Sequence, residues 1–332
     1  MEHHNFKNVV RIIMLTFLIS TSYFVTAQDK FGGLALYTVR DAMEKNPKKT
    51  LQSVSDAGYS YIEAAGYKDG MFYGFSPKEF KAHLASLELI PLSTHQSSVS
   101  IENAASMMAD VKAAGFEYFV VPVPPMGLFI NDDNGMNMKG GVENLATILT
   151  TLGKQARELD LKLLYHNHDF EFIEDASGFV VIDYLLENCD PKYVNFQMDL
   201  HWVTKAKADP LAYFEKYPGR FKLWHVKDMD SQGRFAPVGN GIIDFGRILN
   251  EKEQSGMQAY FVEQDETFAM EPLEAIKVSH KGLKKIGLNS SKSNLFWYFN
   301  WKKNFIFSIK KSIRTIIHQY NWSIRERDVI LF

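Results

Sequence analysis

The hydrophobic pattern of this chain alternates between two kinds of segment from residue 34 to residue 286. Apolar runs of five or six residues, rich in β-branched and aromatic side chains, are typical of strands buried on both faces. Longer segments between them repeat apolar residues every three or four positions, as amphipathic helices do. The eight predicted strands are residues 34–39, 59–64, 90–95, 118–123, 161–165, 194–198, 221–226 and 259–263.

A predicted helix follows each predicted strand, and several helices carry end signals. Ser76, Pro77 and Glu79 match a capping box, with serine as N-cap, proline at the first helical position and glutamate at the third. Gly58 and Gly115 follow two other helices, at the position where a left-handed glycine ends a helix. The predicted helices cover residues 47–57, a segment beginning at 77, and residues 102–114, 142–159, 180–188, 210–217, 245–253 and 273–286.

Eight strand–helix units in about 260 residues predict an α/β fold, a (β/α)8 TIM barrel that forms a single domain. Buried strands joined by helices imply a parallel sheet with right-handed crossovers. An open, doubly wound sheet is the alternative, but no glycine-rich phosphate-binding sequence follows the first strand. The closed barrel is therefore the prediction.

The N-terminus falls outside this repeating pattern. Lys7 and Arg11 precede an apolar run at residues 12–24, and small residues at 25–27 suit cleavage before Gln28. The run is too short for a comfortable membrane span, so residues 1–27 are interpreted as a signal peptide rather than as an anchor or a buried helix. We expect export, to a periplasm, of a barrel domain at residues 28–289. The single cysteine of the chain is compatible with such a disulfide-free protein.

The C-terminal residues 290–332 are also atypical, because they are basic and aromatic. Their net charge of +6 leaves −8 on the rest of the chain. Apolar residues at helical spacing opposite basic ones suit a membrane-surface helix, but we favour a disordered or poorly packed extension outside the natural barrel. An acidic barrel would repel the phosphates of a nucleic acid, so no nucleic-acid partner is expected.

Metal-type side chains gather at the ends of the last four predicted strands. Side chains two apart on a strand share a face, and the carboxyl ends of barrel strands meet at one rim, where active sites lie. Nitrogen and oxygen donors from neighbouring strands suit a single divalent ion, Mn, Zn, Co or Mg. The residues are His166, His168, Asp199, His201, His225, Lys227 and Glu263. Each has an ordinary structural explanation when taken alone, and their coincidence at one rim is what favours a metal.

Five motifs in this half resemble those of the xylose isomerase-like TIM barrels, also called sugar phosphate isomerases/epimerases. The resemblance covers about residues 31–287. The motifs are Tyr-His-Asn-His-Asp-Phe-Glu-Phe at 165–172, Met-Asp-Leu-His at 198–201, His-Val-Lys-Asp at 225–228, Pro-Val-Gly-Asn-Gly-Ile-Ile-Asp-Phe at 237–245 and Val-Glu-Gln-Asp at 262–265. The resemblance implies that one divalent ion is held by His166, Asp199, His225 and Glu263.

The position of His166 departs from the family pattern. Many family epimerases carry glutamate there, and it works with the strand-eight glutamate as an acid/base pair across the substrate. The motifs at 225–228, 239–245 and 263–265 also look like those of inosose dehydratases and keto-sugar hydratases of the same superfamily. The departure therefore weakens the expectation of a symmetric proton exchange between two carboxylates.

The predicted function is a divalent-metal-dependent sugar isomerase or epimerase. It would act on an unphosphorylated sugar or keto-sugar through a metal-stabilised enediolate. Expulsion of a β-hydroxyl from the same intermediate would make it a keto-sugar dehydratase, hydratase or lyase, which is the alternative. A carbohydrate-binding protein without chemistry and a nuclease are less favoured. The expected partner is a small sugar or keto-sugar, and the sequence leaves open whether the chain forms a homo-oligomer.

Other side chains receive roles in this scheme. Glu263, His168 or His201 would be the base, and Lys227 would stabilise the oxyanion unless it forms a surface ion pair with Asp228. Substrate hydroxyls would be bound by a further set of polar residues, for two of which, on the second and third strands, a structural role is equally supported. That set is Glu63, His95, Glu171 and Asp228.

Overall fold

The computed structural model describes residues 30–125, 128–132, 135–138, 140–174, 178–268 and 270–288. The predicted signal peptide and the predicted C-terminal extension lie outside these residues. In the described part of the chain, no helix combines the length and the apolar character needed to cross a bilayer.

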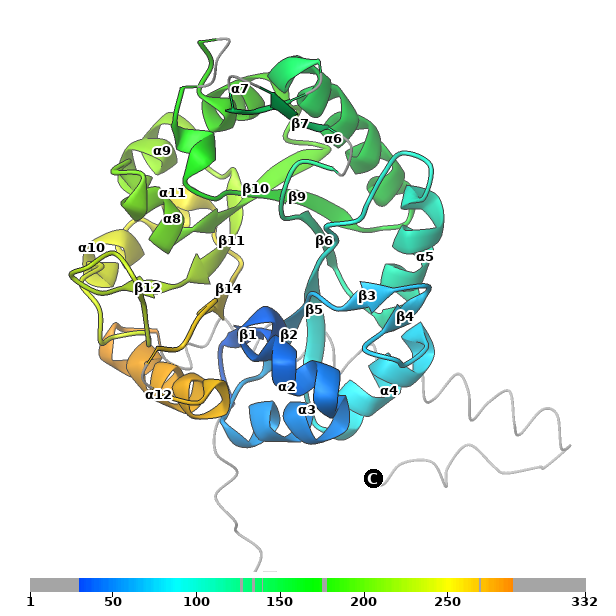
Figure 1. Cartoon of the computed structure of the whole chain (residues 1–332), viewed down its shortest axis with the longest axis vertical. Helices are drawn as coiled ribbons and strands as arrows, with labels where there is room; N and C mark the ends of the chain where they lie inside the picture. The colour runs from blue at the N-terminus through cyan, green and yellow to red at the C-terminus, as the bar shows by residue number, and fades with distance from the viewer. Residues whose placement is uncertain are drawn as a thin grey trace, which may run out of the picture.

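Eight parallel strands close into a barrel, which confirms the predicted fold class (Figure 1). The barrel closes at Gly33 of the first strand, which pairs with Phe261 of the last strand on one side and with Tyr61 on the other. Around the barrel, the order is β1-β14-β11-β10-β9-β6-β5-β2. The strands are β1 (Gly33–Ala35), β2 (Tyr61–Ala64), β5 (Ile90–His95), β6 (Tyr118–Val121), β9 (Lys162–His166), β10 (Val194–Asp199), β11 (Phe221–Val226) and β14 (Ala259–Val262).

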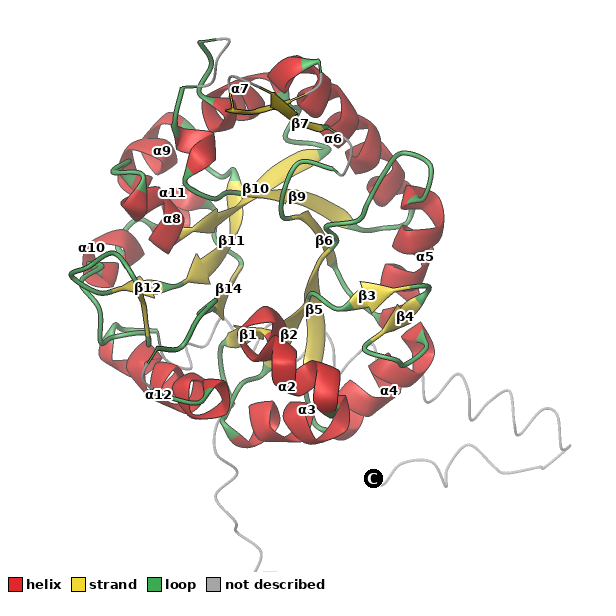
Figure 2. Ribbon diagram, in the orientation of Figure 1, coloured by secondary structure: helices red, strands yellow, loops and turns green. Residues whose placement is uncertain are grey.

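Helices surround the strands on the outside, so the larger apolar core lies between the two layers (Figure 2). The predicted helices are present, although the one expected at residues 245–253 is divided into two short helices. The helices of the outer layer are α3 (Pro47–Asp56), α4 (Pro77–Ser86), α5 (Ala104–Ala114), α6 (Gly141–Glu158), α7 (Val181–Asn188), α9 (Pro210–Lys216), α10 (Phe245–Leu249), α11 (Lys252–Ser255) and α12 (Pro272–Lys285).

The predicted end signals have the expected geometry. Ser76 is the N-cap of α4, and its hydroxyl accepts a hydrogen bond from Glu79 N while the Glu79 carboxylate accepts one from Ser76 N. Gly115 ends α5 in the left-handed conformation, with φ of 91°. Local sequence therefore determines where these helices begin and end.

Several short elements of the structure were not predicted. The first strand ends at Ala35, and residues predicted to continue it form a 3-10 helix, η1 (Leu36–Val39), followed by α2 (Arg40–Lys45). Another helix, α8 (Leu200–Lys205), begins directly at the end of β10. The rest are η2 (Phe170–Phe172) and three hairpins, β3 (Tyr67–Lys68) with β4 (Met71–Phe72), β7 (Phe129–Asp132) with β8 (Gly135–Met138), and β12 (Asp228–Met229) with β13 (Phe235–Ala236).

Candidate active site

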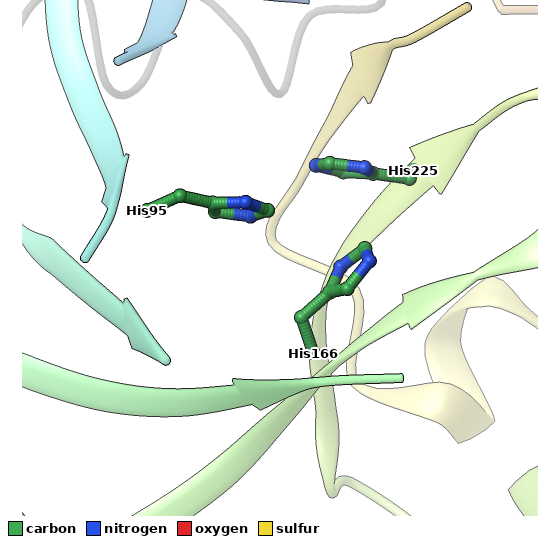
Figure 3. A group of neighbouring side chains, drawn as sticks. All are labelled: His95, His166 and His225. Atoms are coloured by element: carbon green, nitrogen blue, oxygen red, sulfur yellow. The ribbon is translucent and has the colours of Figure 1, made fainter. Parts of the chain in front are cut away.

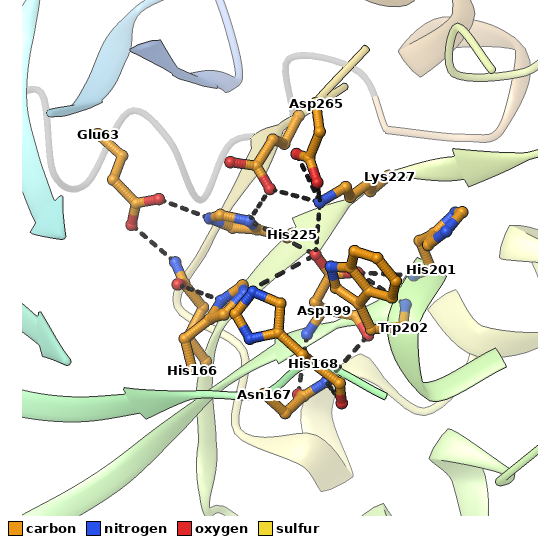
Figure 4. Close-up of polar contacts among 12 residues, drawn as sticks. Glu63, His166, Asn167, His168, Asp199, His201, Trp202, His225, Lys227 and Asp265 are labelled. Carbon is orange, nitrogen blue, oxygen red and sulfur yellow. Dashed lines mark hydrogen bonds and ion pairs between the residues drawn. The ribbon is translucent and has the colours of Figure 1, made fainter. Parts of the chain in front are cut away.

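A buried polar network lies at the carboxyl ends of the barrel strands (Figure 4). Directly below it, a second apolar cluster fills the barrel, and several of its members precede a polar site residue by two positions on the same strand. Because side chains alternate along a strand, the polar residues therefore point into the barrel axis. The cluster comprises Ala35, Tyr61, Tyr118, Val120, Leu164, Leu223, Ala259 and Phe261.

Asp199 has one oxygen held by the backbone and one oxygen directed into the network. Its Oδ1 accepts hydrogen bonds from the N–H groups of His201 (2.9 Å) and Trp202 (3.0 Å), which makes it the N-cap of α8. Its Oδ2 is buried and accepts no hydrogen bond. Burial raises the pKa of this carboxyl above its ordinary value. Its nearest charged neighbours are Lys227 Nζ at 3.4 Å and His225 Nδ1 at 3.8 Å, and neither donates a hydrogen bond to it, so a further group could bind this oxygen directly.

His225 is held between two carboxylates. Its Nε2 donates to Glu63 Oε1 at 2.6 Å, and its Nδ1 lies 2.9 Å from Glu263 Oε2. Burial opposes a charge on this ring, but the two carboxylates raise its pKa well above the ordinary value, so a divalent ion that binds Nδ1 would have to displace a proton. A carboxylate that accepts from one imidazole nitrogen directs the other nitrogen toward a metal in many metal sites. Glu63 therefore orients Nδ1 toward Asp199 and Glu263.

Gln197 orients two further histidines, which face His225 across the barrel (Figure 3). Its Oε1 accepts from His166 Nδ1 at 2.9 Å and from His95 Nε2 at 2.8 Å, and its Nε2 donates to Glu63 Oε2 at 2.8 Å. His166 Nε2 is thereby turned toward Asp199 Oδ2, 3.9 Å away. Burial and the charge of His225 hold the pKa of His166 well below its ordinary value, so the ring is neutral, as a metal ligand must be.

Lys227 is fully buried among three carboxylates rather than paired with Asp228 at the surface. Its Nζ lies 2.9 Å from Glu263 Oε2, 2.7 Å from Asp265 Oδ1 and 3.4 Å from Asp199 Oδ2. Burial opposes its charge, but the carboxylates raise its pKa above the ordinary value. Burial and the charge of Glu263 raise the pKa of Asp265 to about 6. Lys227 is therefore a charged hydrogen-bond donor inside the site.

The arrangement fits one divalent ion. Asp199 Oδ2, a His225 nitrogen and a Glu263 oxygen all lie within 4.8 Å of one another, and His166 Nε2 supplies a fourth donor. Two imidazoles and two carboxylates form the mixed nitrogen and oxygen set that zinc, manganese or cobalt binds. The three histidines of Figure 3 are also close enough to share an ion. Their facing nitrogens are already bonded to Glu63 and Gln197, so we assign the ion to the Asp199 side.

His168 and His201 flank the network and contribute unpaired nitrogens. His168 Nδ1, His201 Nε2 and the indole nitrogen of Trp202 are buried without a hydrogen-bond partner. Burial and the charge of Lys227 lower the pKa of both histidines to about 4, so both are neutral near pH 7. The Trp202 ring contacts both histidines and the Lys227 ammonium, which lies 5.1 Å from its centroid. The indole N–H can donate a hydrogen bond to a neutral substrate, and the two neutral imidazoles can donate or accept one.

Glu171 lies outside the network, in the layer between strands and helices. It accepts hydrogen bonds from the Tyr165 hydroxyl and from His168 N, both at 2.7 Å. Burial raises its pKa to about 8. It therefore supports the backbone of the loop that carries His168, in contrast to the expected contact with substrate.

Asp228 organises the loop that contains Gly239 and Gly241. Its carboxylate accepts hydrogen bonds from the N–H groups of Gly239 and Gly241, both at 2.9 Å, and from Met229 and Ile243. A Cβ on Gly241 would lie 2.1 Å from Asp228 Oδ1, so this approach requires glycine. The anion that this glycine-rich loop binds is thus an aspartate of the chain itself.

The structure brings together most of the residues that the sequence indicated. His166, Asp199, His225, Lys227 and Glu263 share one network, and His168 and His201 adjoin it. Glu63 and His95 also belong to it, but they bond to other side chains of the network. No role had been predicted for Gln197, Asp265 or Trp202. The two-residue spacing from Gln197 to Asp199 and from Glu263 to Asp265 was the available signal, since it places each pair on one face.

Known proteins match this chain in sequence and in fold. A model of the family described as xylose isomerase-like TIM barrel matches residues 51–286, which is more than half of the chain. An inosose dehydratase of Lacticaseibacillus casei is 30% identical over 142 residues, which are 37% of this chain and 47% of that protein. The chain thus spans about half the length of the curated relatives that it matches.

Solved structures support the same fold. A sugar phosphate isomerase/epimerase of Parabacteroides distasonis has a TM-score of 0.66 and 23% identity, covering 78% of this chain and 95% of that chain. The structure of IOLI protein with a bound zinc atom has a TM-score of 0.58 and 16% identity, covering 78% and 99% of the two chains. At these identities the likeness concerns the fold alone.

Proposed function

We propose that this chain, which belongs to the xylose isomerase-like TIM barrel family, is a divalent-metal-dependent lyase of an unphosphorylated keto-sugar. It would remove the proton beside the carbonyl and expel a substituent from the next carbon. The observation that carries the proposal is Asp199 Oδ2, which accepts no hydrogen bond and is grouped with ligand atoms of His225 and Glu263, with His166 Nε2 3.9 Å away. Each of these imidazoles has its other nitrogen held by a neighbouring side chain.

A divalent ion held by these four residues would polarise the sugar carbonyl and stabilise negative charge on its oxygen. Glu263 is the carboxylate assigned to accept the proton. Burial opposes its charge, but the charges of Lys227 and His225 hold its pKa well below the ordinary value, so the group is ionised and can take up a proton. Lys227 is suited to donate a hydrogen bond to the carbonyl oxygen as charge develops there. The resulting electron pair forms a C=C bond as the adjacent C–O bond breaks. The leaving oxygen would take a proton from protonated Glu263 or from water, and the products would be an enone and water or an alcohol.

Elimination is favoured because the two proton-transfer groups of a family epimerase are not both carboxylates here. His166 stands at the strand-five position, and its Nδ1 is tied to Gln197 at 2.9 Å. One carboxylate, Glu263, is then left to act as base. The similarity to inosose dehydratases supports the same class of reaction.

Isomerisation or epimerisation is the second candidate, and His168 favours it. Its Nδ1 is unpaired, and its pKa of about 4 leaves the ring neutral and able to accept a proton. A second base of this kind would allow a proton to be removed by one group and returned by another.

A neutral sugar is the favoured substrate in either case. Lys227 is already neutralised by three carboxylates, and the glycine-rich loop is occupied by Asp228. The network therefore offers a phosphate group no free cation among the described residues. A small keto-sugar with hydroxyls as its polar groups fits the unpaired neutral donors and acceptors.

The test is to incubate the metal-loaded protein in D2O with methyl 3-keto-glucoside and follow the reaction by NMR. We expect an enone and released methanol, and Glu263→Gln should lower kcat by at least about a hundredfold. Glu271→Gln, an exposed acid before α12, is the matched control and should change kcat by less than about twofold. Deuterium uptake without bond cleavage would favour the epimerase, and neither change would contradict both candidates.

Export to a periplasm is proposed on the basis of residues 1–27 alone. The apolar run after two basic residues and the small residues at 25–27 support it. Cell fractionation and the intact mass of the recovered chain would test it, with Gln28 as the expected first residue. A cytoplasmic chain that retains Met1 would contradict the proposal.

A further inference from the structure

The exposed large hydrophobic residues of the described chain all lie in connections that run from a strand to the next helix. Single exposed apolar residues are normal on protein surfaces, but they are usually scattered. Here they are confined to the end of the barrel that carries the polar network. They are Tyr37, Met71, Ile101, Phe170, Ile173, Phe179, Ile242 and Phe268. The rim of the site is therefore suited to an apolar part of a ligand.

A cavity of about 320 Å³ opens in this rim between the connection after β1 and the connection after β14. Its lining includes Thr38, Arg40, Asp265 and Phe268. Asp265 also belongs to the polar network, because its Oδ1 lies 2.7 Å from Lys227 Nζ. Only the Asp265 side chain therefore separates the cavity from Lys227, which also contacts Glu263. About 300 Å³ is the lower end of the range for small-molecule sites, enough for one ring.

Two arginine–aromatic pairs stiffen the edges of this cavity. The Arg40 guanidinium lies 4.5 Å from the ring centroid of Tyr37 and donates to Asp265 O at 2.6 Å, which ties the two connections together. The Arg234 guanidinium lies 5.3 Å from the ring centroid of Phe268. Phe268 is nevertheless 54% exposed. An exposed ring held in place in this way can pack against a flat ligand at little entropic cost.

The charges around the cavity exclude an anionic ligand. Asp41, Asp265 and Glu266 line it together with Arg40, whose guanidinium already donates to the carbonyl oxygens of Tyr37 and Asp265. Arg234 at the edge is paired with Asp230 at 2.8 Å. Carboxylates accept hydrogen bonds from hydroxyl groups and repel phosphates and carboxylic acids. A neutral ring therefore matches the lining.

We propose that this cavity holds the second ring of a glycoside substrate, the aglycone, while the keto-sugar ring occupies the polar network. This proposal rests on the proposed lyase function, in which the aglycone is the β-substituent. Glu263 would take the proton from the carbon beside the carbonyl, and the electron pair left behind would form a C=C bond as the glycosidic C–O bond breaks. The aglycone oxygen would then take a proton from protonated Glu263 or from water and leave as an alcohol or phenol. The preferred substrate class is then a keto-glycoside with an aromatic aglycone.

The test compares 4-nitrophenyl and methyl 3-keto-β-glucosides with wild-type protein, Phe268→Ala, Phe268→Tyr and Phe179→Ala. We expect wild type to prefer the aryl substrate in kcat/KM by about tenfold or more, because an aromatic contact contributes about that factor. Phe268→Ala should remove this preference and leave the methyl substrate unchanged, whereas Phe268→Tyr should retain it. Phe179 is an exposed phenylalanine of the same rim that does not line this cavity, so Phe179→Ala is the matched control and should behave as wild type.

Binding of the unoxidised 4-nitrophenyl and methyl β-glucosides, measured by calorimetry, separates this proposal from the proposed reaction. Aryl binding that Phe268→Ala weakens about tenfold, without turnover of either keto-glucoside, would support the subsite and contradict the lyase. Equal binding and equal kcat/KM for aryl and methyl compounds would overturn the subsite. An equal loss for both compounds in Phe268→Ala would overturn it as well.

Discussion

The proposed metal ligands share one feature, which is that the protein holds the polar atom that would not bind the ion. The backbone of α8 binds Asp199 Oδ1, Glu63 binds His225 Nε2 and Gln197 binds His166 Nδ1. Side chains fixed in this way do not have to be ordered when the ion binds. The free energy of metal binding therefore depends on residues that never contact the metal.

Glu63→Gln tests this dependence. A glutamine keeps the size of the side chain but loses the charge that orients His225, so we expect metal affinity to fall by about 10–100-fold. Competition titration with a metal-sensitive dye measures the change. Glu117→Gln is the control, because Glu117 pairs with Lys162 away from the site. Unchanged affinity in Glu63→Gln would mean that its contact with His225 has no role in metal binding.

Lys227→Met tests the buried cation. Removing it leaves Asp199, Glu263 and Asp265 without their common partner, and loss of one partner of a buried ion pair costs about 3–5 kcal/mol. Urea unfolding in the presence of a chelator measures the difference. Lys216→Met, which removes an exposed ion pair with Glu187, should cost much less. Equal stability of the two variants would contradict the account of the network.

Glu171→Gln tests the raised pKa of this buried acid. With a pKa of about 8 in the folded chain against an ordinary 4.5, the folded state binds a proton that the unfolded state has lost between these values. This contribution to stability is complete below the lower value and disappears as pH rises through the higher one. The slope is at most about 1.4 kcal/mol per pH unit. Urea unfolding at several pH values should show this slope in wild type and its loss in the variant, whereas parallel curves would contradict it.

The strand-end residues could be predicted from sequence because strand alternation alone places them on one face. What could not be predicted is which of them bond to each other. For Glu63, substrate binding and a structural role were equally supported by the sequence. In the structure its carboxylate contacts His225, His95, Ser93 and Gln197. Those contacts join β2 to β5, β10 and β11. The hydrophobic pattern of one segment contains no information about distances between side chains of different strands.

At the scale of elements, long periodic segments were predictable and short ones were not. The eight barrel strands and the outer helices follow hydrophobic periodicity, which the sequence displays directly. In contrast, η1, α8 and the hairpins after β2 and β11 are too short to show a period. Their geometry depends on tertiary contacts, as when Asp199 ends β10 and at the same time caps α8.

The contact between α12 and the Asp228 loop gives a prediction at this scale. A Cβ on Gly282 would lie 1.7 Å from Val238 O, and a Cβ on Gly239 in the loop would lie 3.2 Å from Gly282 Cα. Alanine favours helix, yet Gly282→Ala must push the loop away, so we expect a net destabilisation of about 1–3 kcal/mol. Gly246→Ala in α10, where a Cβ meets only ordinary contact, should be neutral or stabilising in urea unfolding. Similar stability for the two variants would contradict this packing.

At the scale of the whole molecule, one end of the barrel carries the buried network, the exposed apolar residues and the cavity beside Asp265. This arrangement agrees with the general placement of active sites in TIM barrels. The rest of the described chain supplies the layers that hold eight strand ends in register. Family membership and fold then predict where a reaction would take place, and the side chains of the network would determine which reaction it is.

The metal content of the purified protein, determined by inductively coupled plasma mass spectrometry, tests the proposed metal site most directly. After chelation and reloading with zinc, manganese, cobalt or magnesium, we expect one tightly bound ion per chain for at least one of them. Asp199→Ala should lose this ion while it remains folded. A folded wild-type protein that retains none of the four ions, or an Asp199→Ala variant that binds them equally well, would contradict the proposed site.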